Sequence, residues 1–300
     1  MKKKNFLRIL SLICALCTIS LASCESFLSS DFFDSELNSG TSSERETEEN
    51  LSGENEQKQE NEQESNGDKD IEPDGNPPAT AISTFEKKEY TADSVTLKYW
   101  LYTPKNATEN MPLIVYLHGG SGKGDDLELI TSVDGFPQYL KDGKLTPNAY
   151  VIIPQVSSAY RGWGEMKAEV IKLISFVQKQ HKINEKQISL TGHSMGGTGA
   201  WMLALAYPNT FSAVAPLSGS VTLSDVNINK LKNMPVWAVV GTQDTIVEPQ
   251  SSINFINKLA EVNDKAKLTE LNGADHFAVP SMTYLSKEFN VVEWLISNTK

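Results

Sequence analysis

The sequence predicts an α/β protein in which a mostly parallel central sheet is flanked by helices on both faces. From about residue 82 onward, short apolar runs alternate with longer segments of helical periodicity. This alternation is typical of βαβ units and a parallel sheet. Several of the short runs are apolar throughout, as expected for strands buried on both faces. Polar or glycine-rich segments follow four of the runs, at the sheet edge where such proteins bind ligands.

Turn-forming residues bound many of the predicted elements. The expected strands cover residues 95–102, 113–117, 150–153, 187–191, 213–217, 236–240 and 267–271. Pro104 and Pro154 end two of these strands, and Pro208 ends one of the helices. The expected helices cover residues 165–180, 195–207, 251–262 and 284–297.

The first 24 residues predict export. Three lysines at positions 2–4 precede an apolar stretch from Phe6 to Leu21, which is typical of a secretory signal and short for a membrane span. The segment that ends in Ala22, Ser23 and Cys24 resembles the lipobox of bacterial lipoproteins. That resemblance implies a signal peptide over residues 1–23, a lipid on Cys24, and an extracytoplasmic protein anchored to the bacterial membrane. Ordinary signal cleavage with an incidental cysteine is the alternative.

Residues 24–80 are expected to form a disordered linker before a folded domain at 81–300. Residues 25–74 contain 17 acidic and 3 basic side chains and few aliphatic ones. Such a segment cannot bury enough apolar surface to offset its chain entropy. We expect it to act as a tether, with a partner-binding acidic tail as the alternative.

The composition of the folded region excludes several functions. The whole chain has a net charge of −11, but the acidic linker accounts for most of it. The remainder has no Lys and Arg cluster of the kind that neutralises phosphates, so we expect no nucleic-acid binding. All three cysteines lie in the first 24 residues, which leaves the domain without a disulfide or a thiolate metal site. No other ligand cluster has metal spacing, and we expect no metal or other cofactor.

A candidate nucleophile lies after the predicted strand 187–191. The segment Gly192-His-Ser-Met-Gly196 fits the pattern G-x-S-x-G, in which a sharp strand-to-helix turn projects a serine hydroxyl above the sheet. The pattern alone is weak, but here an apolar strand precedes it and a helix of small residues follows. We therefore predict Ser194 as a nucleophile.

A serine hydroxyl is a poor nucleophile unless a histidine takes its proton and a carboxylate orients that histidine. Of the four histidines, His118 lies in an early turn, His181 ends a helix, and His193 adjoins the serine with its side chain directed away. His276 remains, in a loop after the last strand and in the chain order typical of such sites. We predict it as the base, with a surface histidine as the alternative.

The orienting carboxylate is expected a few residues after a strand. Asp244 follows the strand 236–240 in this way, whereas Glu248 and Asp225 are the alternatives. Asp275 adjoins His276 directly and is poorly placed to hold it. We predict Asp244 as the acid.

An oxyanion formed at this serine would need two N–H donors. The amide of Met195 is the first candidate, because it begins a helix whose dipole favours negative charge. The amide of Gly120, in the loop 118–122, is the second, and a neighbouring residue of that loop or a simple glycine-rich turn is the alternative.

These segments together resemble the α/β-hydrolase superfamily from about Phe85 to the C-terminus. The segments 117–120, 153–155 and 192–197 are similar to those of carboxylesterases such as feruloyl and acetylxylan esterases and polyhydroxybutyrate depolymerase-like enzymes. The resemblance implies an α/β-hydrolase fold and hydrolysis of ester substrates, polysaccharide-linked acyl groups among them, through an acyl-enzyme at Ser194. Only residues 218–235 separate two predicted strands, which leaves no room for a large cap domain.

Aromatic residues near the predicted site are candidates for substrate contact. Trp163 is the preferred one, since glycines flank it in a loop, and Tyr160 and Phe277 are the others. Packing in the core is the alternative for all three. A peptidase of the prolyl-oligopeptidase-like group or a lipase would share the chemistry. A tethered binding module without catalysis would not need the complete set of serine, acid and histidine.

Overall fold

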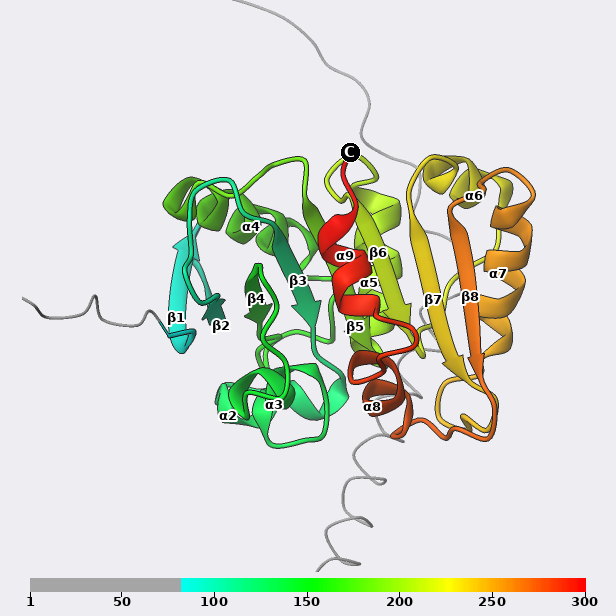
Figure 1. Cartoon of the computed structure of the whole chain (residues 1–300), viewed down its shortest axis with the longest axis horizontal. Helices are drawn as coiled ribbons and strands as arrows, with labels where there is room; N and C mark the ends of the chain where they lie inside the picture. Colours follow the sequence, from blue (N-terminus) through cyan, green and yellow to red (C-terminus); the bar gives the residue numbers. More distant parts are fainter. Residues whose placement is uncertain (1–81) are drawn as a thin grey trace, which may run out of the picture. The chain divides into compact units, whose positions relative to one another are not determined.

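The computed structural model describes residues 82–300. The predicted signal peptide, Cys24 and the linker at 24–80 lie outside the described residues. The described part forms three layers, with an eight-stranded sheet between two layers of helices (Figure 1). This arrangement confirms the predicted α/β architecture.

The strands follow the spatial order β1-β2-β4-β3-β5-β6-β7-β8. Their bounds are β1 Thr84–Ala92, β2 Val95–Thr103, β3 Leu113–Leu117, β4 Tyr150–Pro154, β5 Ile188–His193, β6 Ala213–Leu217, β7 Val236–Gly241 and β8 Ala266–Leu271. The strands β3 to β8 pair in parallel, and β1 and β2 pair antiparallel at one end. All seven predicted strands are present, so the mostly parallel sheet is confirmed.

The strand β1 was missed by the sequence prediction. It forms a hairpin with β2 through Asp93 and Ser94, whose φ angles of 48° and 65° suit a two-residue hairpin turn. Its aromatic packing contacts come from Phe85, which stacks on Trp100 with ring centroids 4.5 Å apart, and from Tyr90, whose ring lies 4.7 Å from that of Phe176. Most of the other side chains of β1 are exposed or half-buried, so the apolar signal is weak.

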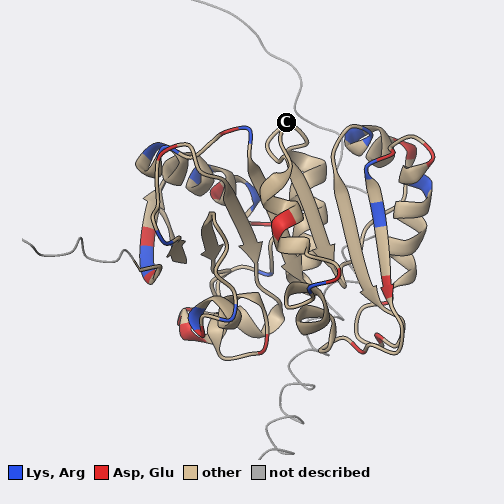
Figure 2. Cartoon of the chain, in the orientation of Figure 1, with Lys and Arg blue, Asp and Glu red and all other residues tan. Residues whose placement is uncertain are grey.

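Charged side chains protect the edges of the sheet. The edge strand β1 carries Glu86, Lys87, Lys88 and Glu89, and the opposite edge strand β8 carries charges too, whereas β3 to β7 carry none (Figure 2). Charges on edge strands oppose pairing with other chains, and central strands buried on both faces cannot hold them.

The helices cover the two faces of the sheet in separate groups. One group packs over the side chains of Leu113, Val115 and Leu190, and it consists of α4 Lys167–His181, α5 Met195–Ala206, α6 Asp225–Leu231 and α7 Gln250–Ala260. The other group packs over Ile114 and Val151, and it consists of α2 Glu128–Thr131, α3 Phe136–Lys141, α8 Val279–Tyr284 and α9 Val291–Ser297. Across residues 82–300, no helix is both long and apolar enough to span a membrane.

The predicted C-terminal helix over 284–297 is wrong in its extent. Only α9 lies within this range: α8 ends at Tyr284, and residues 285–290 separate the two helices. Asn290 adopts a left-handed conformation with φ 50°, which interrupts a continuous helix before Val291. The short helices α2, α3 and α6 were not predicted, because four to seven residues are too few to show a helical period.

The loops at the carboxyl edge of the parallel strands carry the candidate residues. The loop after β3 holds Gly120, the turn after β5 holds Ser194, and the loops after β7 and β8 hold Asp244 and His276. Between β6 and β7 the chain contains only α6, and no large cap covers this edge, as predicted.

Candidate active site

Ser194 occupies a strained turn between β5 and α5. Its φ of 61° and ψ of −122° lie where residues with a side chain are rare, at a cost of about 1–3 kcal/mol. Backbone hydrogen bonds hold the turn: the Ser194 amide donates to the Leu217 carbonyl at 3.0 Å, and the Thr198 amide donates to the Ser194 carbonyl at 2.9 Å. The predicted strand-to-helix turn at this serine is therefore present.

The glycines of the motif allow neighbouring strands to touch this turn. A Cβ atom on Gly196 would lie 1.8 Å from the carbonyl oxygen of Leu117, at the end of β3. A Cβ on Gly192 would lie 2.6 Å from the same oxygen, and one on Gly197 would lie 2.2 Å from the Leu217 oxygen. Any side chain at these positions would push the ends of β3 or β6 away from Ser194.

Asp244 and His276 form the predicted pair. The Nδ1 of His276 lies 2.7 Å from Oδ2 of Asp244, and the two residues are only 3% and 5% exposed. The other carboxylate oxygen accepts the amides of Ile246 and Val247 at 3.0 and 2.9 Å. Burial raises the pKa of Asp244, but the hydrogen bonds from His276 and Val247 outweigh it and hold the pKa below its ordinary value.

The ionised carboxylate fixes the proton of His276 on Nδ1, because a carboxylate can only accept. Nε2 is then free to act as a base, which is the chemistry predicted for this residue. The alternative acids have no such contact: Glu248 is exposed, and Asp225 begins α6. Asp275 instead accepts the amides of Phe277 and Ala278 at 3.1 and 2.9 Å and shapes the loop.

The structure brings His276 against the residue that precedes the serine. The rings of His193 and His276 have centroids 4.5 Å apart, and Nε2 of His193 donates to the His276 carbonyl at 3.0 Å. The hydroxyl of Ser194, which is half-buried, makes no hydrogen bond to another residue of the described region. Such bonds at catalytic sites are often long in the absence of substrate.

The glycine loop after β3 lies directly beside Ser194. A Cβ on Gly119 would come within 3.5 Å of the Ser194 Cβ and 3.3 Å of the His193 carbonyl oxygen. Gly120 begins a short 3₁₀ helix, η1 Gly120–Gly122, and Met195 begins α5. The first amides of a helix have no acceptor within it, so both can donate to a bound oxyanion. That donation stays a prediction.

His118 shapes this loop, a role that the sequence prediction missed. Its Nδ1 donates to the Gly119 carbonyl at 2.7 Å, and its Nε2 accepts the amide of Val156 at 3.0 Å. Burial lowers the pKa of His118 to about 4, which keeps the ring neutral and able to accept. The signal that could have found it is a histidine directly before paired glycines.

Trp163 does not face a substrate, and the prediction that it does is wrong. The side chain is 2% exposed and packs against His118, with ring centroids 4.9 Å apart. Its indole N–H donates to the His118 carbonyl at 3.0 Å, and a Cβ on Gly199 would lie 2.6 Å from the ring. The indole therefore packs in the core and supports the loop that follows β3.

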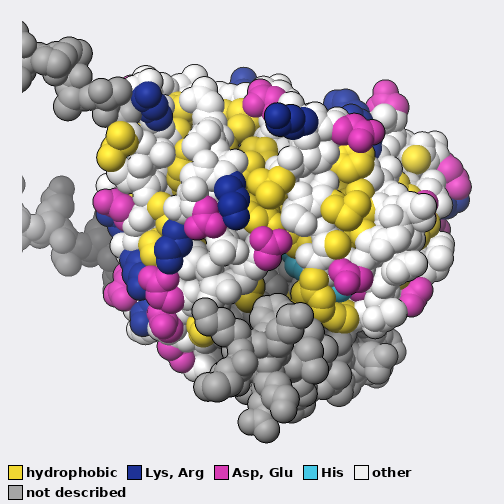
Figure 3. All heavy atoms as spheres, turned by 60° about the horizontal axis from the view of Figure 1, so that its bottom comes forward, with side chains coloured by type: hydrophobic (Ala, Val, Ile, Leu, Met, Phe, Trp, Pro, Cys, Tyr) yellow, Lys and Arg dark blue, Asp and Glu magenta, His cyan; other side chains and the backbone are white. Residues whose placement is uncertain are grey.

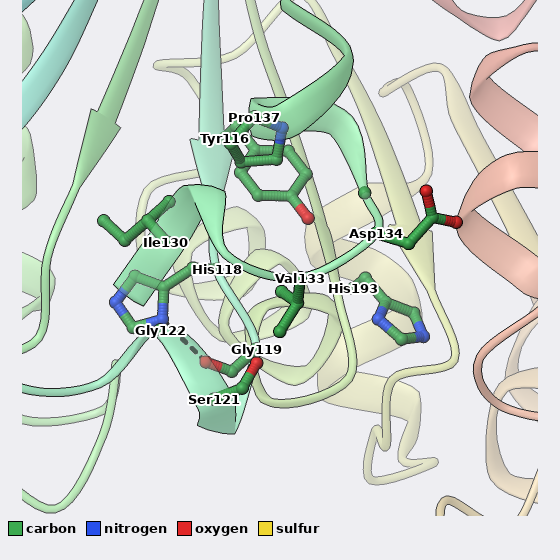
Figure 4. A pocket seen from close by; sticks show the side chains of 11 residues that line it. Tyr116, His118, Gly119, Ser121, Gly122, Ile130, Val133, Asp134, Pro137 and His193 are labelled. Carbon is green, nitrogen blue, oxygen red and sulfur yellow. Dashed lines mark hydrogen bonds between the residues drawn. The ribbon is translucent and has the colours of Figure 1, made fainter. Parts of the chain in front are cut away.

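Phe277 is the aromatic residue that the structure leaves open beside the base. It is 50% exposed and meets His276 edge to face, with ring centroids 5.6 Å apart. A view towards this edge of the sheet shows histidine side chains in a recess flanked by apolar and acidic groups (Figure 3). Beside the glycine loop, a cavity of about 40 Å³ extends between His118 and His193 (Figure 4).

The buried His118 predicts acid sensitivity. The unfolded chain binds a proton at this residue below about pH 6.5, whereas the folded chain binds it only near pH 4. The unfolded state therefore holds more protons on this residue in this window, and His118 contributes a fall of about 3 kcal/mol in the free energy of unfolding as the pH drops from 6.5 to 4. Denaturant titrations across this range should give a shallower slope for His118→Gln than for the wild type. Equal slopes would contradict the assignment.

The described residues contain no group of three or more His, Cys, Asp or Glu side chains arranged to hold a metal ion. The chemistry at this edge is instead that of a serine, a histidine and a carboxylate on the loops of a parallel sheet. Fold and site together define an α/β-hydrolase.

Comparison with known proteins identifies the family within the α/β-hydrolases to which the chain belongs. Residues 95–280 match the family described as "Putative esterase", and the chain belongs to this esterase family. In sequence, it is 32% identical over 120 residues to cutinase est1 of Thermobifida alba, covering 39% of this chain and 38% of that protein. It is 24% identical over 166 residues to the bifunctional acetylxylan esterase/xylanase XynS20E of Neocallimastix patriciarum, covering 52% of this chain and 22% of that protein.

Solved structures share the fold. A thermostable esterase is 26% identical with a TM-score of 0.62, and the match covers 72% of this chain and 63% of that one. The feruloyl esterase module of Clostridium thermocellum, complexed with sinapinate, is 17% identical with a TM-score of 0.54, covering 70% of this chain and 89% of that one. The chain spans less than half the length of the two curated relatives above.

Proposed function

We propose that the protein is an extracytoplasmic serine esterase that hydrolyses carboxylic esters through an acyl-enzyme at Ser194. The observation that carries the proposal is the buried hydrogen bond of 2.7 Å between Asp244 and His276, on the same sheet edge as the strained turn of Ser194. A binding module would gain nothing from a buried carboxylate that orients an imidazole. Membership of the esterase family supports the same conclusion.

The proposed reaction assigns a role to each of these groups. Nε2 of His276 takes the proton of the Ser194 hydroxyl as Oγ attacks the ester carbonyl carbon. The amides of Gly120 and Met195 stabilise the oxyanion, and the protonated imidazole then gives its proton to the departing alcohol. A water molecule repeats these steps on the acyl-enzyme, releases the acid and restores the serine.

Acyl groups on plant polysaccharides are the proposed substrate class. Similar proteins are described as an acetylxylan esterase/xylanase and as feruloyl esterase B of Thermothelomyces thermophilus. The edge of the sheet carries no large cap, which suits esters attached to a bulky chain. The signal sequence and a lipid on Cys24 would place the enzyme outside the cytoplasm, anchored to the membrane.

A panel of esters tests this function. The purified protein, produced without residues 1–24, is assayed on acetylated xylan, methyl ferulate, long-chain triglyceride and a peptide 4-nitroanilide. The proposal expects turnover of the acetyl or feruloyl esters above the other two. Preference for the triglyceride would indicate a lipase, preference for the anilide would indicate a peptidase, and no turnover of any substrate would contradict the proposed function.

Phe277 is expected to contribute to binding of aromatic acyl groups. Its exposed ring can contact an aryl group held near His276, and the loss of such a contact costs about 1 kcal/mol, or about fivefold in KM. Phe277→Ala should therefore raise KM for methyl ferulate about fivefold and leave kcat nearly unchanged. Val262→Ala, another exposed apolar position beyond the end of α7, serves as the control. An unchanged KM in Phe277→Ala would contradict the contact.

A further inference from the structure

His193 contacts the base as well as adjoining the nucleophile. Its Nε2 lies 3.0 Å from the carbonyl oxygen of His276, 83 residues further along the chain. The planes of the two rings are inclined by 40°, with centroids 4.5 Å apart. The contact therefore joins the end of β5 directly to the loop that follows β8. The sequence prediction had directed this side chain away from the site.

The acceptor fixes the protonation of the His193 ring. A carbonyl can only accept, so the neutral ring carries its proton on Nε2 and leaves Nδ1 as an acceptor. Burial, followed by repulsion from a protonated His276, lowers the pKa of His193 to about 3. The ring is therefore neutral near pH 7, and it stays neutral when His276 becomes charged during a reaction.

The surroundings of the His193 ring are compatible with a proton on Nε2 and an acceptor at Nδ1. His193 lines the cavity of about 40 Å³ beside the glycine loop, together with the buried Tyr116 (Figure 4). The cavity has room for a water molecule, which can donate to Nδ1. The Tyr116 hydroxyl, which belongs to another residue that lines this cavity, can hold that water.

The other contacts of the His276 loop act in different directions. Asp244 holds the imidazole through Nδ1, from the side of β7. Asp275 accepts the amides of Phe277 and Ala278, which fixes the shape of the loop itself. Neither contact joins the loop to β5, the strand that ends directly before Ser194. The N–H of His193 makes that connection, because His193 is the last residue of β5.

We propose that His193 is a positioning residue: its Nε2–H, donated to the His276 carbonyl, holds the base at the distance from Ser194 that proton transfer requires. The inference rests on the proposed function, since it concerns the rate of ester hydrolysis. A displacement of about 1 Å between reacting groups can lower a rate about 100-fold. The ring of His193 itself exchanges no proton with the substrate.

Two substitutions separate the effect of the hydrogen bond on kcat from the effect of the ring's volume. His193→Phe keeps a ring but removes the N–H, whereas His193→Gln places an amide N–H near the position of Nε2. His181→Phe is the matched control, because this half-buried ring lies at the end of α4 against Tyr150, with centroids 4.8 Å apart. All three variants and the wild type are assayed for kcat and KM on a 4-nitrophenyl ester, and their folding is checked by circular dichroism.

The inference expects kcat of His193→Phe to fall about 10- to 100-fold with KM nearly unchanged. His193→Gln should recover most of this loss, and His181→Phe should match the wild type. A wild-type kcat in His193→Phe, or equal losses in the Phe and Gln variants, would overturn the inference while leaving the proposed function intact. An inactive wild type would instead contradict the proposed function.

Nuclear magnetic resonance of the wild-type protein with ¹⁵N-labelled histidine gives a test that needs no active variant. His118 and His276 are expected to carry their protons on Nδ1, and His193 on Nε2. The His193 signals are assigned from their absence in His193→Gln or His193→Phe. A proton on Nδ1 of His193 would overturn the inference, because the ring would then have no N–H to donate to the His276 carbonyl.

Discussion

Ser194→Ala is expected to lower kcat for every ester substrate by about 10⁵- to 10⁶-fold, with little change in KM. Alanine removes the atom that attacks the carbonyl, and no other group at this edge of the sheet replaces it. The remaining rate should reflect only binding and the oxyanion donors, since these still act without the nucleophile. Initial rates at saturating concentrations of a 4-nitrophenyl ester measure the effect.

The fold should survive this change. A hydroxyl without a hydrogen-bond partner in the described region contributes little to packing, and alanine at φ 61° is strained to a similar degree as serine. Ser220→Ala, a half-buried serine in the loop after β6, is the matched control and should keep the wild-type rate. A Ser194→Ala protein that retains a tenth or more of the activity would rule out Ser194 as the nucleophile.

Asp244→Asn is expected to lower kcat by about 10⁴-fold. The amide keeps the shape of the carboxylate, but its NH₂ group favours the wrong tautomer of His276, with the proton on Nε2. The base then points a proton, rather than a lone pair, at Ser194. The charge that stabilises the imidazolium during the reaction is lost as well.

The measurement is kcat at pH 7 to 8, with Asp225→Asn as the control. Asp225 lies in the first turn of α6 and does not contact His276, so its variant should match the wild type. An Asp244→Asn protein within tenfold of the wild-type kcat would contradict the role of this carboxylate. Full activity in Asp244→Asn together with a large loss in Glu248→Gln would instead identify Glu248 as the acid.

The central strands and the positions of the nucleophile, acid and base could be predicted from the sequence for one physical reason. A parallel sheet brings the carboxyl ends of its strands to one edge, so residues that follow different strands meet whatever their separation in the chain. Ser194 and Asp244 each follow a largely buried strand, and His276 follows the edge strand β8. The pattern of glycines around the serine also has a direct steric cause, as the contacts of Gly196 with Leu117 demonstrate.

Side-chain packing around these positions could not be predicted in the same way. Trp163 and Phe277 look alike as loop aromatics, but one is 2% exposed and the other 50%. The exposed fraction of each ring depends on which neighbouring side chains cover it. The paths of the loops determine those neighbours, and loop sequences have no periodicity from which a path could be predicted. The hydrogen bond from His193 to His276 likewise depends on the path of a loop 83 residues away. The strand β1 was not predicted, because among its charged residues only Phe85 and Tyr90 pack their rings against the core, one in each core cluster.

The central claim is that a proton leaves Ser194 for His276 so that the serine attacks. Treatment of the wild-type protein with a fluorophosphonate, followed by peptide mass spectrometry, tests it most directly, because this reagent traps an activated serine as a covalent adduct. We predict one adduct, on Ser194. It should form quickly in the wild type and at least about 1,000-fold more slowly in His276→Ala, because loss of the base in a serine, histidine and carboxylate set has an effect of this order. An adduct on another serine, or equal rates in the two proteins, would contradict the account.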